Sequence, residues 1–251
     1  MTRTLYDRLL ERAHSAEPVQ RLLLGLNWSV AQVETCGLCF SPPEPPRTLD
    51  WPGTIAGRAA SELVSWIRSP ELAEATVALT VINALLNQPH NDCLKHARPL
   101  EELAPPHLAV FASFKEQVRG AKVVVVGRYP GLEAIWDPRD YSCLERRPLP
   151  GTLPERVAPE TLAAADWVFI TASSLANQSL PQLLQWSHGA RVVLMGPSTP
   201  WLAEWADFGV HYLAGVEVLE PEELFRIAAE GGGTRIFERA VRYKLLDLNR
   251  A

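Results

Sequence analysis

A chain of 251 residues that is 47% hydrophobic can form one large domain or two ordinary ones with a real buried core, which excludes a disordered chain. The net charge of -5, without a Lys/Arg-rich cluster, argues against a nucleic-acid partner. No apolar run approaches the roughly 20 residues that span a bilayer, and the sequence opens as an amphipathic helix rather than a signal peptide. We therefore expect a cytoplasmic protein with no membrane partner, whose four cysteines are mostly thiols.

The first half of the chain has the pattern of an α+β unit. Its expected elements are a helix at 4–16, strands of an antiparallel meander within 19–26 and 29–40 that turn near Asn27 and Gly37, and helices at 57–67 and 71–86. The last helix is apolar on nearly every side and should be buried. A proline-rich stretch from 98 to 106 follows, so we place a domain boundary there and predict domains of 1–106 and 107–251.

The second half alternates strands with helices. Four consecutive valines, 123–126, lack alternation and predict a strand covered on both faces, as in a parallel sheet. Around it we expect a linking helix at 107–119, strands at 141–145, 166–171, 191–195 and 210–213, helices at 159–165, 180–187, 201–206 and 220–230, and a closing helix at 234–246. This alternation predicts a doubly wound, Rossmann-like α/β domain.

Three of these strands end in small, polar, Gly or Pro residues, which a doubly wound sheet would gather at one edge. The residues concerned are Gly127, Arg128, Tyr129, Pro130, Thr171, Ser173, Ser174, Asn177, Gly196, Pro197, Ser198 and Thr199. Ordinary turns also favour such residues, which is the alternative interpretation. Because the enrichment recurs at the same end of three strands, we favour a binding site for an anionic or polar small molecule, with Arg128 pairing an anionic group.

Glu145 supports a second hypothesis. It lies 18 residues after Gly127, close to the spacing at which a dinucleotide-binding fold presents an acid to the ribose. The protein would then be a transferase or oxidoreductase with a nucleotide-type cofactor, S-adenosylmethionine or NAD-like. However, the turn Gly127-Arg-Tyr-Pro-Gly131 is not G-x-G-x-x-G and carries bulky side chains. Glu145 could equally cap a helix or pair with a neighbouring arginine.

The cysteines raise the question of a metal site. Cys36 and Cys39 have C-x-x-C spacing, and Cys93 lies between His90 and His96 within seven residues further along. Cys36, Cys39, His90 and Cys93 could together complete a four-ligand site. Against this, residues three apart in a strand point to opposite faces, and thiols in apolar strands are more often core. Oxygen-rich strand ends would favour hard cations, so a soft metal would need these cysteines or a chelator with its own donors.

Five short stretches, in order, resemble one family. They are Val81-Ile-Asn83-Ala-Leu-Leu-Asn87, Val125-Val-Gly127-Arg-Tyr-Pro130, Glu145-Arg-Arg-Pro148, Ile170-Thr-Ala-Ser-Ser-Leu-Ala-Asn177 and Val193-Leu-Met-Gly196-Pro-Ser-Thr-Pro200. The chain resembles the putative heavy-metal chelation family, in which an enolase-N-terminal-like domain precedes a Rossmann-like domain. This chain departs from the family in Tyr129 and in Ala172-Ser-Ser, which could alter ligand choice but not the fold.

The resemblance implies a cleft between the two domains, formed by the strand-end loops together with Asn83. It also implies a role in binding or processing a small metal-chelating molecule. Asn83 could instead simply bond a neighbouring backbone group. The expected partner is thus a small molecule or metal chelate, and a metal ion or chelate is the candidate cofactor. The sequence leaves open whether a reaction is catalysed, whether the protein is a scaffold with a vestigial pocket, and whether it forms a homo-oligomer.

Overall fold

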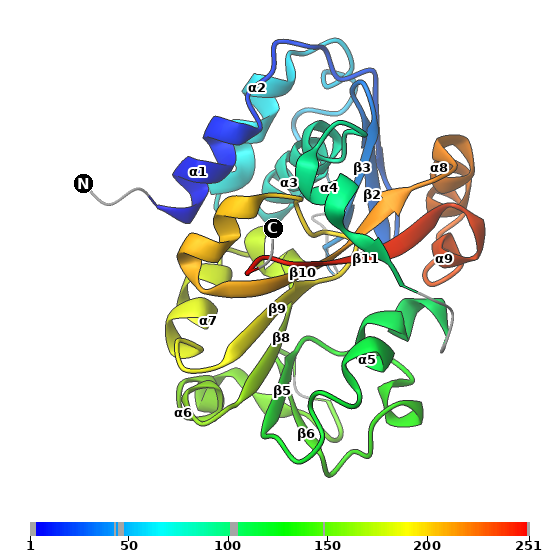
Figure 1. Cartoon of the computed structure of the whole chain (residues 1–251). Coiled ribbons are helices and arrows are strands. Elements are labelled where there is room, and N and C mark those ends of the chain that lie inside the picture. The colour runs from blue at the N-terminus through cyan, green and yellow to red at the C-terminus, as the bar shows by residue number, and fades with distance from the viewer. Residues whose placement is uncertain (1–3, 43, 45–47, 101–104, 148, 250–251) are drawn as a thin grey trace.

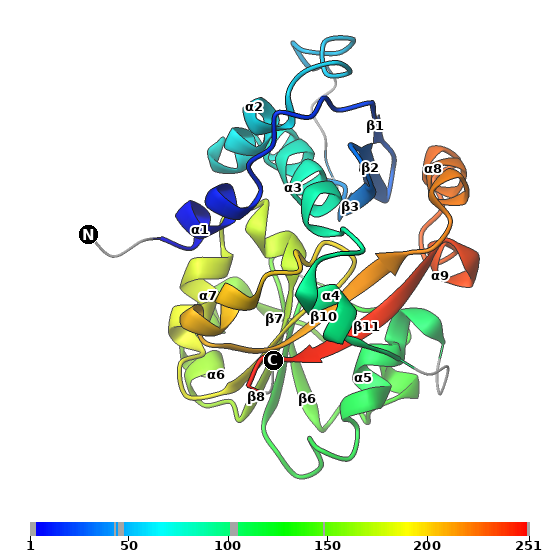
Figure 2. The same cartoon turned by 45° about the horizontal axis from the view of Figure 1, so that its top comes forward.

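A computed structural model describes residues 4–42, 44, 48–100, 105–147 and 149–249. Within these ranges the chain forms a three-stranded antiparallel sheet with helices, followed by an eight-stranded, mixed and mostly parallel sheet. Figure 1 shows the N-terminal elements at one end of the large sheet, and Figure 2 gives the same arrangement turned toward the viewer. The expected order of an α+β unit followed by an α/β unit is confirmed at this level.

The N-terminal elements follow the predicted sequence of helix, strands and helices. They are α1 (Leu5–Arg12), β1 (Arg21–Leu24), β2 (Trp28–Gln32), β3 (Cys36–Phe40), α2 (Ala60–Val64), η1 (Ser65–Arg68, a 3-10 helix) and α3 (Leu72–Leu86). α1 begins at a capping box in which the side chains of Thr4 and Asp7 each accept from the other's backbone N–H. α3 is buried along almost its whole length, as its apolar sequence predicts.

The turn expected near Gly37 is wrong. The chain turns at 33–35, and Gly37 lies inside β3, paired with Ala31. A Cβ atom at Gly37 would lie 2.0 Å from the backbone nitrogen of Ala84, so this glycine permits close contact between β3 and α3. Glycine marks such a backbone approach as well as a turn, and the sequence does not distinguish the two.

The large sheet has the strand order β4-β11-β10-β9-β8-β5-β6-β7, with β5 to β10 parallel to one another. Its strands are β4 (Arg98–Pro99), β5 (Val123–Val126), β6 (Tyr141–Glu145), β7 (Leu153–Pro154), β8 (Trp167–Thr171), β9 (Arg191–Met195), β10 (Val210–Val218) and β11 (Val241–Asp247). Between them lie α4 (Asp92–His96), η2 (Pro106–Leu108), α5 (Ala109–Phe114), η3 (Leu132–Ala134), η4 (Glu155–Val157), α6 (Ala158–Ala163), η5 (Ala172–Leu175), α7 (Leu180–Trp186), η6 (Ala203–Phe208), α8 (Pro221–Ala229) and α9 (Ile236–Arg239).

The valine strand β5 is buried on both faces, as predicted. Val124 belongs to one hydrophobic cluster, which it shares with α3, α6 and α7. Val123 and Val125 belong to the opposite cluster, which includes α5 and α8. Alternate valines therefore pack against helices on opposite sides of the sheet, and the absence of polar alternation follows from this two-sided burial.

The predicted closing helix at 234–246 is wrong. After the single turn of α9, residues Val241 to Asp247 form β11, which pairs antiparallel with β10 over seven residues. Val241, Tyr243 and Leu245 are buried in one cluster, at a spacing of two. This period-2 burial and the pairing with β10 outweigh the helix propensity of the leucines and basic residues. The sheet is consequently mixed rather than wholly parallel.

β4 gives the first half of the chain a place in the large sheet. Arg98 and Pro99 pair with Leu245 and Lys244 of β11, although they precede the expected boundary at 106. No helix in the described ranges is long and apolar enough to cross a membrane.

Candidate functional site

The carboxyl ends of β5, β8 and β9, three neighbouring strands, bring Gly127, Thr171 and Gly196 together. Gly127 has φ +97° and Gly196 has φ +107°, a region that favours glycine. A Cβ atom on Gly127 would lie 3.0 Å from Cγ2 of Thr171, and one on Gly196 would lie 3.9 Å from Oγ1 of the same threonine. The side chain of Thr171 therefore packs against the main chain of both glycines.

Tyr129 completes this cluster from the loop after β5. Its hydroxyl would lie 3.6 Å from a Cβ atom on Gly196, and its ring packs edge-on against Phe111 with centroids 4.9 Å apart. Burial raises the pKa of Tyr129 to about 12, partly offset by a hydrogen bond with Thr171. The phenol therefore stays neutral at physiological pH.

The polar side chains of the loop after β8 differ in their hydrogen-bond partners. Ser174 donates to the carbonyl oxygen of Thr171 at 2.7 Å, and the Asn177 side chain accepts from the backbone and hydroxyl of Ser179. These two predicted residues hold the loop in shape. The hydroxyls of Thr171 and Ser173 lie 3.0 Å apart, within hydrogen-bond distance of each other, and both residues are partly exposed.

The loop after β9 connects the two sheets. Ser198, which is buried, accepts a hydrogen bond at its Oγ from the backbone N–H of Phe40, the last residue of β3, at 2.9 Å. Thr199, also buried, donates its hydroxyl to the carbonyl oxygen of Gly196 at 2.8 Å. These two predicted residues therefore fix the loop and its contact with β3, while Pro197 is buried beside them.

Asn83 lies at the same junction. Its Nδ2 donates to the carbonyl oxygens of Leu38 in β3 and of Ser198, at 2.9 and 3.0 Å. One turn later, Asn87 donates to the carbonyl oxygen of Cys36 at 3.0 Å. Since β3 is an edge strand, the two asparagines satisfy carbonyls that no further strand covers. This geometry supports a structural role for Asn83, although its buried Oδ1 has no partner among the described residues.

Glu145 faces the loop after β5 rather than standing free. Its carboxylate accepts from the backbone N–H of Arg128 at 3.2 Å and from that of Arg147 at 3.4 Å. The guanidinium of Arg128 is exposed and has no hydrogen-bond or ion-pair partner among the described residues. Pro130 is exposed beside it.

Comparisons with known proteins show the family and the fold of this chain. The family model DUF364, described as "Putative heavy-metal chelation", matches residues 109–247, and DUF4213, with the same description, matches residues 6–86. The chain belongs to the DUF364 family. No protein among those with curated functions matches it.

Two solved structures of the DUF364 family are similar to this chain. One is a protein of unknown function from Desulfitobacterium hafniense DCB-2, with a TM-score of 0.83 and 28% identity, over 97% of this chain and 96% of that one. The other, from Pyrococcus horikoshii, has a TM-score of 0.77 and 18% identity, over 97% and 100% of the two chains. At that identity the second likeness shows the fold alone.

The heavy-metal description of the DUF364 family can be tested against the donors in this chain. No three His, Cys, Asp or Glu side chains in the described ranges lie close enough together to hold a metal ion. Cys36 and Cys39 are buried in opposite clusters, Cys93 is buried in α4, and His90 is exposed in the turn before it. The structure thus does not bring the four predicted ligands together.

Burial also disfavours the thiolate form of these cysteines. It raises the pKa of Cys36 and Cys93 to about 11 and that of Cys39 to about 12. The thiolate, not the thiol, binds metals. The donors in the described ranges therefore do not fit a directly bound heavy-metal ion.

Two residues of this region were not expected from the sequence. Cys143 lies in β6, with its thiol 3.6 Å from the carbonyl oxygen of Gly127, and it is partly exposed whereas the other cysteines are buried. Phe40 ends β3 beside Ser198 with a 43% exposed side chain. The period of two along β6 was the signal for Cys143, because it places that residue on the same face as Glu145.

Proposed function

We propose that the protein binds a small polar molecule, or a metal ion already held by such a molecule, at the carboxyl ends of β5, β8 and β9. The observation that carries the proposal is the convergence of Gly127, Thr171 and Gly196. Two glycines with left-handed backbone flank the partly exposed Thr171, and one of them, Gly127, is itself partly exposed. Glycines at parallel strand ends are where α/β proteins bring backbone groups against a ligand.

We further infer that the first unit is enolase-N-terminal-like and the second a doubly wound, Rossmann-like domain. The strand order supports the second inference, because the chain runs outward from β5 to β6 and β7 and then returns to β8 on the other side of β5. The junction of β5 and β8 is then the topological switch point, where open α/β sheets bind their ligands. Gly127 directly follows β5, and Thr171 is the last residue of β8.

The available groups favour an anion with hydroxyl or amide partners. Arg128 supplies an unpaired positive charge at the end of β5, while Thr171, Ser173 and Tyr129 supply hydroxyls. Hydroxyls and amides are poor ligands for soft metals. A heavy metal would consequently enter as a complex whose organic part supplies the metal donors and whose carboxylates meet Arg128.

A nucleotide-type cofactor is the second candidate, favoured by the position of Glu145 at the end of the strand beside β5. Two features oppose it. The backbone N–H of Arg128, which would face a phosphate, already donates to the Glu145 carboxylate. The element after β5 is the three-residue η3, too short to supply the helix dipole that such sites use.

Cys143 provides the test, because its thiol is partly exposed and lies beside Gly127. Burial, with a contribution from Glu145, raises the pKa of Cys143 to about 11, so alkylation at pH 8 is slow enough to follow. We would measure its alkylation rate with ferric citrate, nickel citrate, metal-free citrate, free Ni²⁺, S-adenosylmethionine and NAD. The proposal predicts protection by the citrate complexes.

Arg128→Ala should reduce that protection, whereas Arg156→Ala should not. Arg156 is the matched control because its guanidinium is also exposed and without a partner among the described residues. Protection by S-adenosylmethionine or NAD alone would favour the second candidate. Identical alkylation with every probe would contradict the proposal.

A further inference from the structure

A second region of the molecule has the shape of a ligand site. A cavity of about 950 Å³ lies where the first turn of α1 meets α7 and the end of η6. It is lined by Thr4, Leu5, Tyr6, Asp7, Arg68, Gln178, Pro181, Leu184, Gln185, His188, Asp207, Phe208 and Gly209. None of these residues belongs to the strand-end site, and the volume is in the range of small-molecule pockets.

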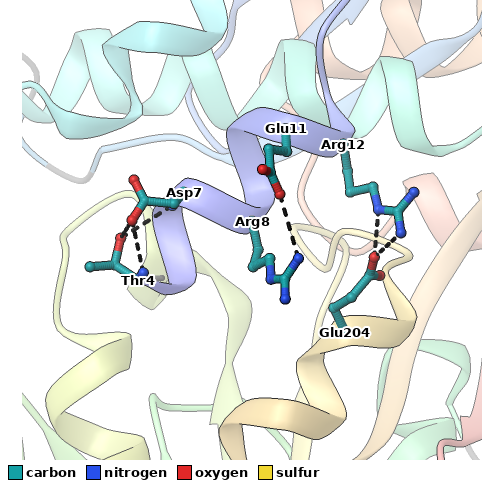
Figure 3. Close-up of polar contacts among 6 residues, drawn as sticks. All are labelled: Thr4, Asp7, Arg8, Glu11, Arg12 and Glu204. Carbon is teal, nitrogen blue, oxygen red and sulfur yellow. Dashed lines mark hydrogen bonds and ion pairs between the residues drawn. The ribbon is translucent and has the colours of Figure 1, made fainter. Parts of the chain in front are cut away.

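The cavity is anchored by contacts of α1 at both of its ends. Figure 3 shows Thr4 and Asp7 joined at the start of α1 and Arg12 paired with Glu204 of η6 at its end. Tyr6 donates its hydroxyl to the carbonyl oxygen of Leu175 at 2.9 Å, which ties α1 to the segment before α7. These contacts hold α1 against η6 and the segment before α7, which contribute residues to the lining.

The charged side chains that line the cavity differ in whether they have an ion-pair partner. Asp7 pairs with Arg68, so these two charges cancel. Asp207 is exposed at the rim and has no hydrogen-bond or ion-pair partner among the described residues. Among the described lining residues, Asp207 is thus the carboxylate without a partner, and Leu5, Leu184 and Phe208 supply apolar side chains to the same lining.

Gln178, one of the lining residues, has an unusual backbone conformation. Its φ of +60° is the only left-handed value of a residue other than glycine in the described ranges. Its side chain donates to the carbonyl oxygen of Ser69 at 2.7 Å, which holds η1 against the start of α7. Strained backbone persists only where the surroundings impose it, and such residues cluster at ligand sites.

We propose that this cavity binds a small organic cation, an amine whose apolar body packs on Leu5, Leu184 and Phe208 and whose ammonium group pairs with Asp207. Charge complementarity selects the cation, because the guanidinium of Arg68, the arginine among the described lining residues, is already paired with Asp7. The apolar lining selects an amine with a hydrocarbon or aromatic body over a bare ammonium ion. This site lies beyond the strand-end site and does not depend on it.

Calorimetric titration of the full chain with 2-phenylethylammonium tests the proposal, with ethylammonium and 3-phenylpropionate as comparison probes. The phenyl group should strengthen binding by more than about tenfold over ethylammonium, because it buries apolar surface. The carboxylate probe should not bind. Asp207→Asn should weaken phenylethylammonium by about fivefold, the scale of an exposed ion pair.

Asp207→Arg should reverse the preference, so that 3-phenylpropionate binds and the amine does not. Asp140→Asn and Asp140→Arg are the matched controls, since Asp140 is an exposed aspartate outside the cavity, and both should leave binding unchanged. All these positions are exposed, so the variants should fold. Equal binding of the two ammonium ions, or an amine affinity unaffected by either Asp207 change, would overturn the proposal.

Discussion

Asn83 and Ser198 are joined by a hydrogen bond of 3.0 Å from the Asn83 side-chain amide to the Ser198 carbonyl oxygen. The second hydrogen of the same amide bonds Leu38 in β3. One buried side chain therefore links α3, β3 and the strand-end loop of the large sheet. Together with the hydrogen bond from the Phe40 N–H to Ser198, this contact holds the N-terminal elements against that loop.

Replacing Asn83 should destabilise the protein. Asn83→Ala would leave two buried carbonyls without donors, which costs about 2 kcal/mol or more. We expect a lower urea midpoint with an unchanged slope. Asn249→Ala is the control, because Asn249 is exposed and bonds only its neighbour Asp247, so a change within about 0.5 kcal/mol is expected. Equal midpoints for the two variants would contradict this role of Asn83.

Gly37 should not tolerate any side chain. A Cβ atom there would lie 2.0 Å from the backbone of Ala84 and 2.5 Å from the carbonyl oxygen of Thr80, so β3 and α3 would have to separate. Gly37→Ala should therefore cost about 3 kcal/mol or more, measured by thermal or urea unfolding. In contrast, a Cβ atom at Gly189 would have no heavy atom within 4 Å. Gly189→Ala should therefore leave the free energy of unfolding unchanged or raise it slightly. A mild effect at Gly37 would show that the two elements are less closely packed.

Gly127 and Thr171 should be coupled. Gly127→Ala strains the backbone and places a Cβ atom 3.0 Å from Cγ2 of Thr171, which together should cost about 2 kcal/mol. Thr171→Ser removes that methyl group, so the double variant should recover part of the loss. A double-mutant cycle from urea unfolding measures the coupling energy. Additive effects would show that the two residues do not contact each other.

The pKa of Asp7 predicts an acid-dependent contribution to stability. Hydrogen bonds from the side chain and backbone of Thr4, and then from Arg68, lower the pKa of Asp7 from 3.8 to about 2. Because the folded pKa lies below the unfolded one, its contribution is present above pH 4 and is lost as the pH falls toward 2. Urea midpoints of the wild type and Asp7→Asn should therefore differ at pH 6 and converge near pH 2. A difference that stays constant over this range would contradict the assignment.

The sequence predicted the parts of the fold that depend on local pattern. The buried α3 and the valine strand follow from runs of apolar residues without alternation, which require cover on all sides. β11 was missed because Leu245 and Leu246 are consistent with a helix, and only pairing with β10 over seven residues decides the question. Such pairing joins distant segments and leaves little local signal.

Part of the candidate site could likewise be predicted from the sequence, and part could not. Gly127, Thr171 and Gly196 could be predicted from strand ends, since parallel strands carry their carboxyl ends to one edge. The roles of the individual serines in the loops could not be predicted. Ser174 and Ser198 carry the same hydroxyl as Ser173, but theirs form hydrogen bonds with backbone groups. The four predicted metal ligands failed to assemble because Cys36 and Cys39 point to opposite faces of β3.

Metal content measured together with the mass of the intact protein tests the central claim most directly. Elemental analysis and native mass spectrometry would be applied to protein purified without chelators or a metal-affinity step, and then to protein incubated with nickel citrate. The account predicts that nickel and citrate are retained together in equal amounts and are lost together in Arg128→Ala. Nickel retained without citrate, and unaffected by Arg128→Ala, would show direct coordination by protein side chains and would contradict the account.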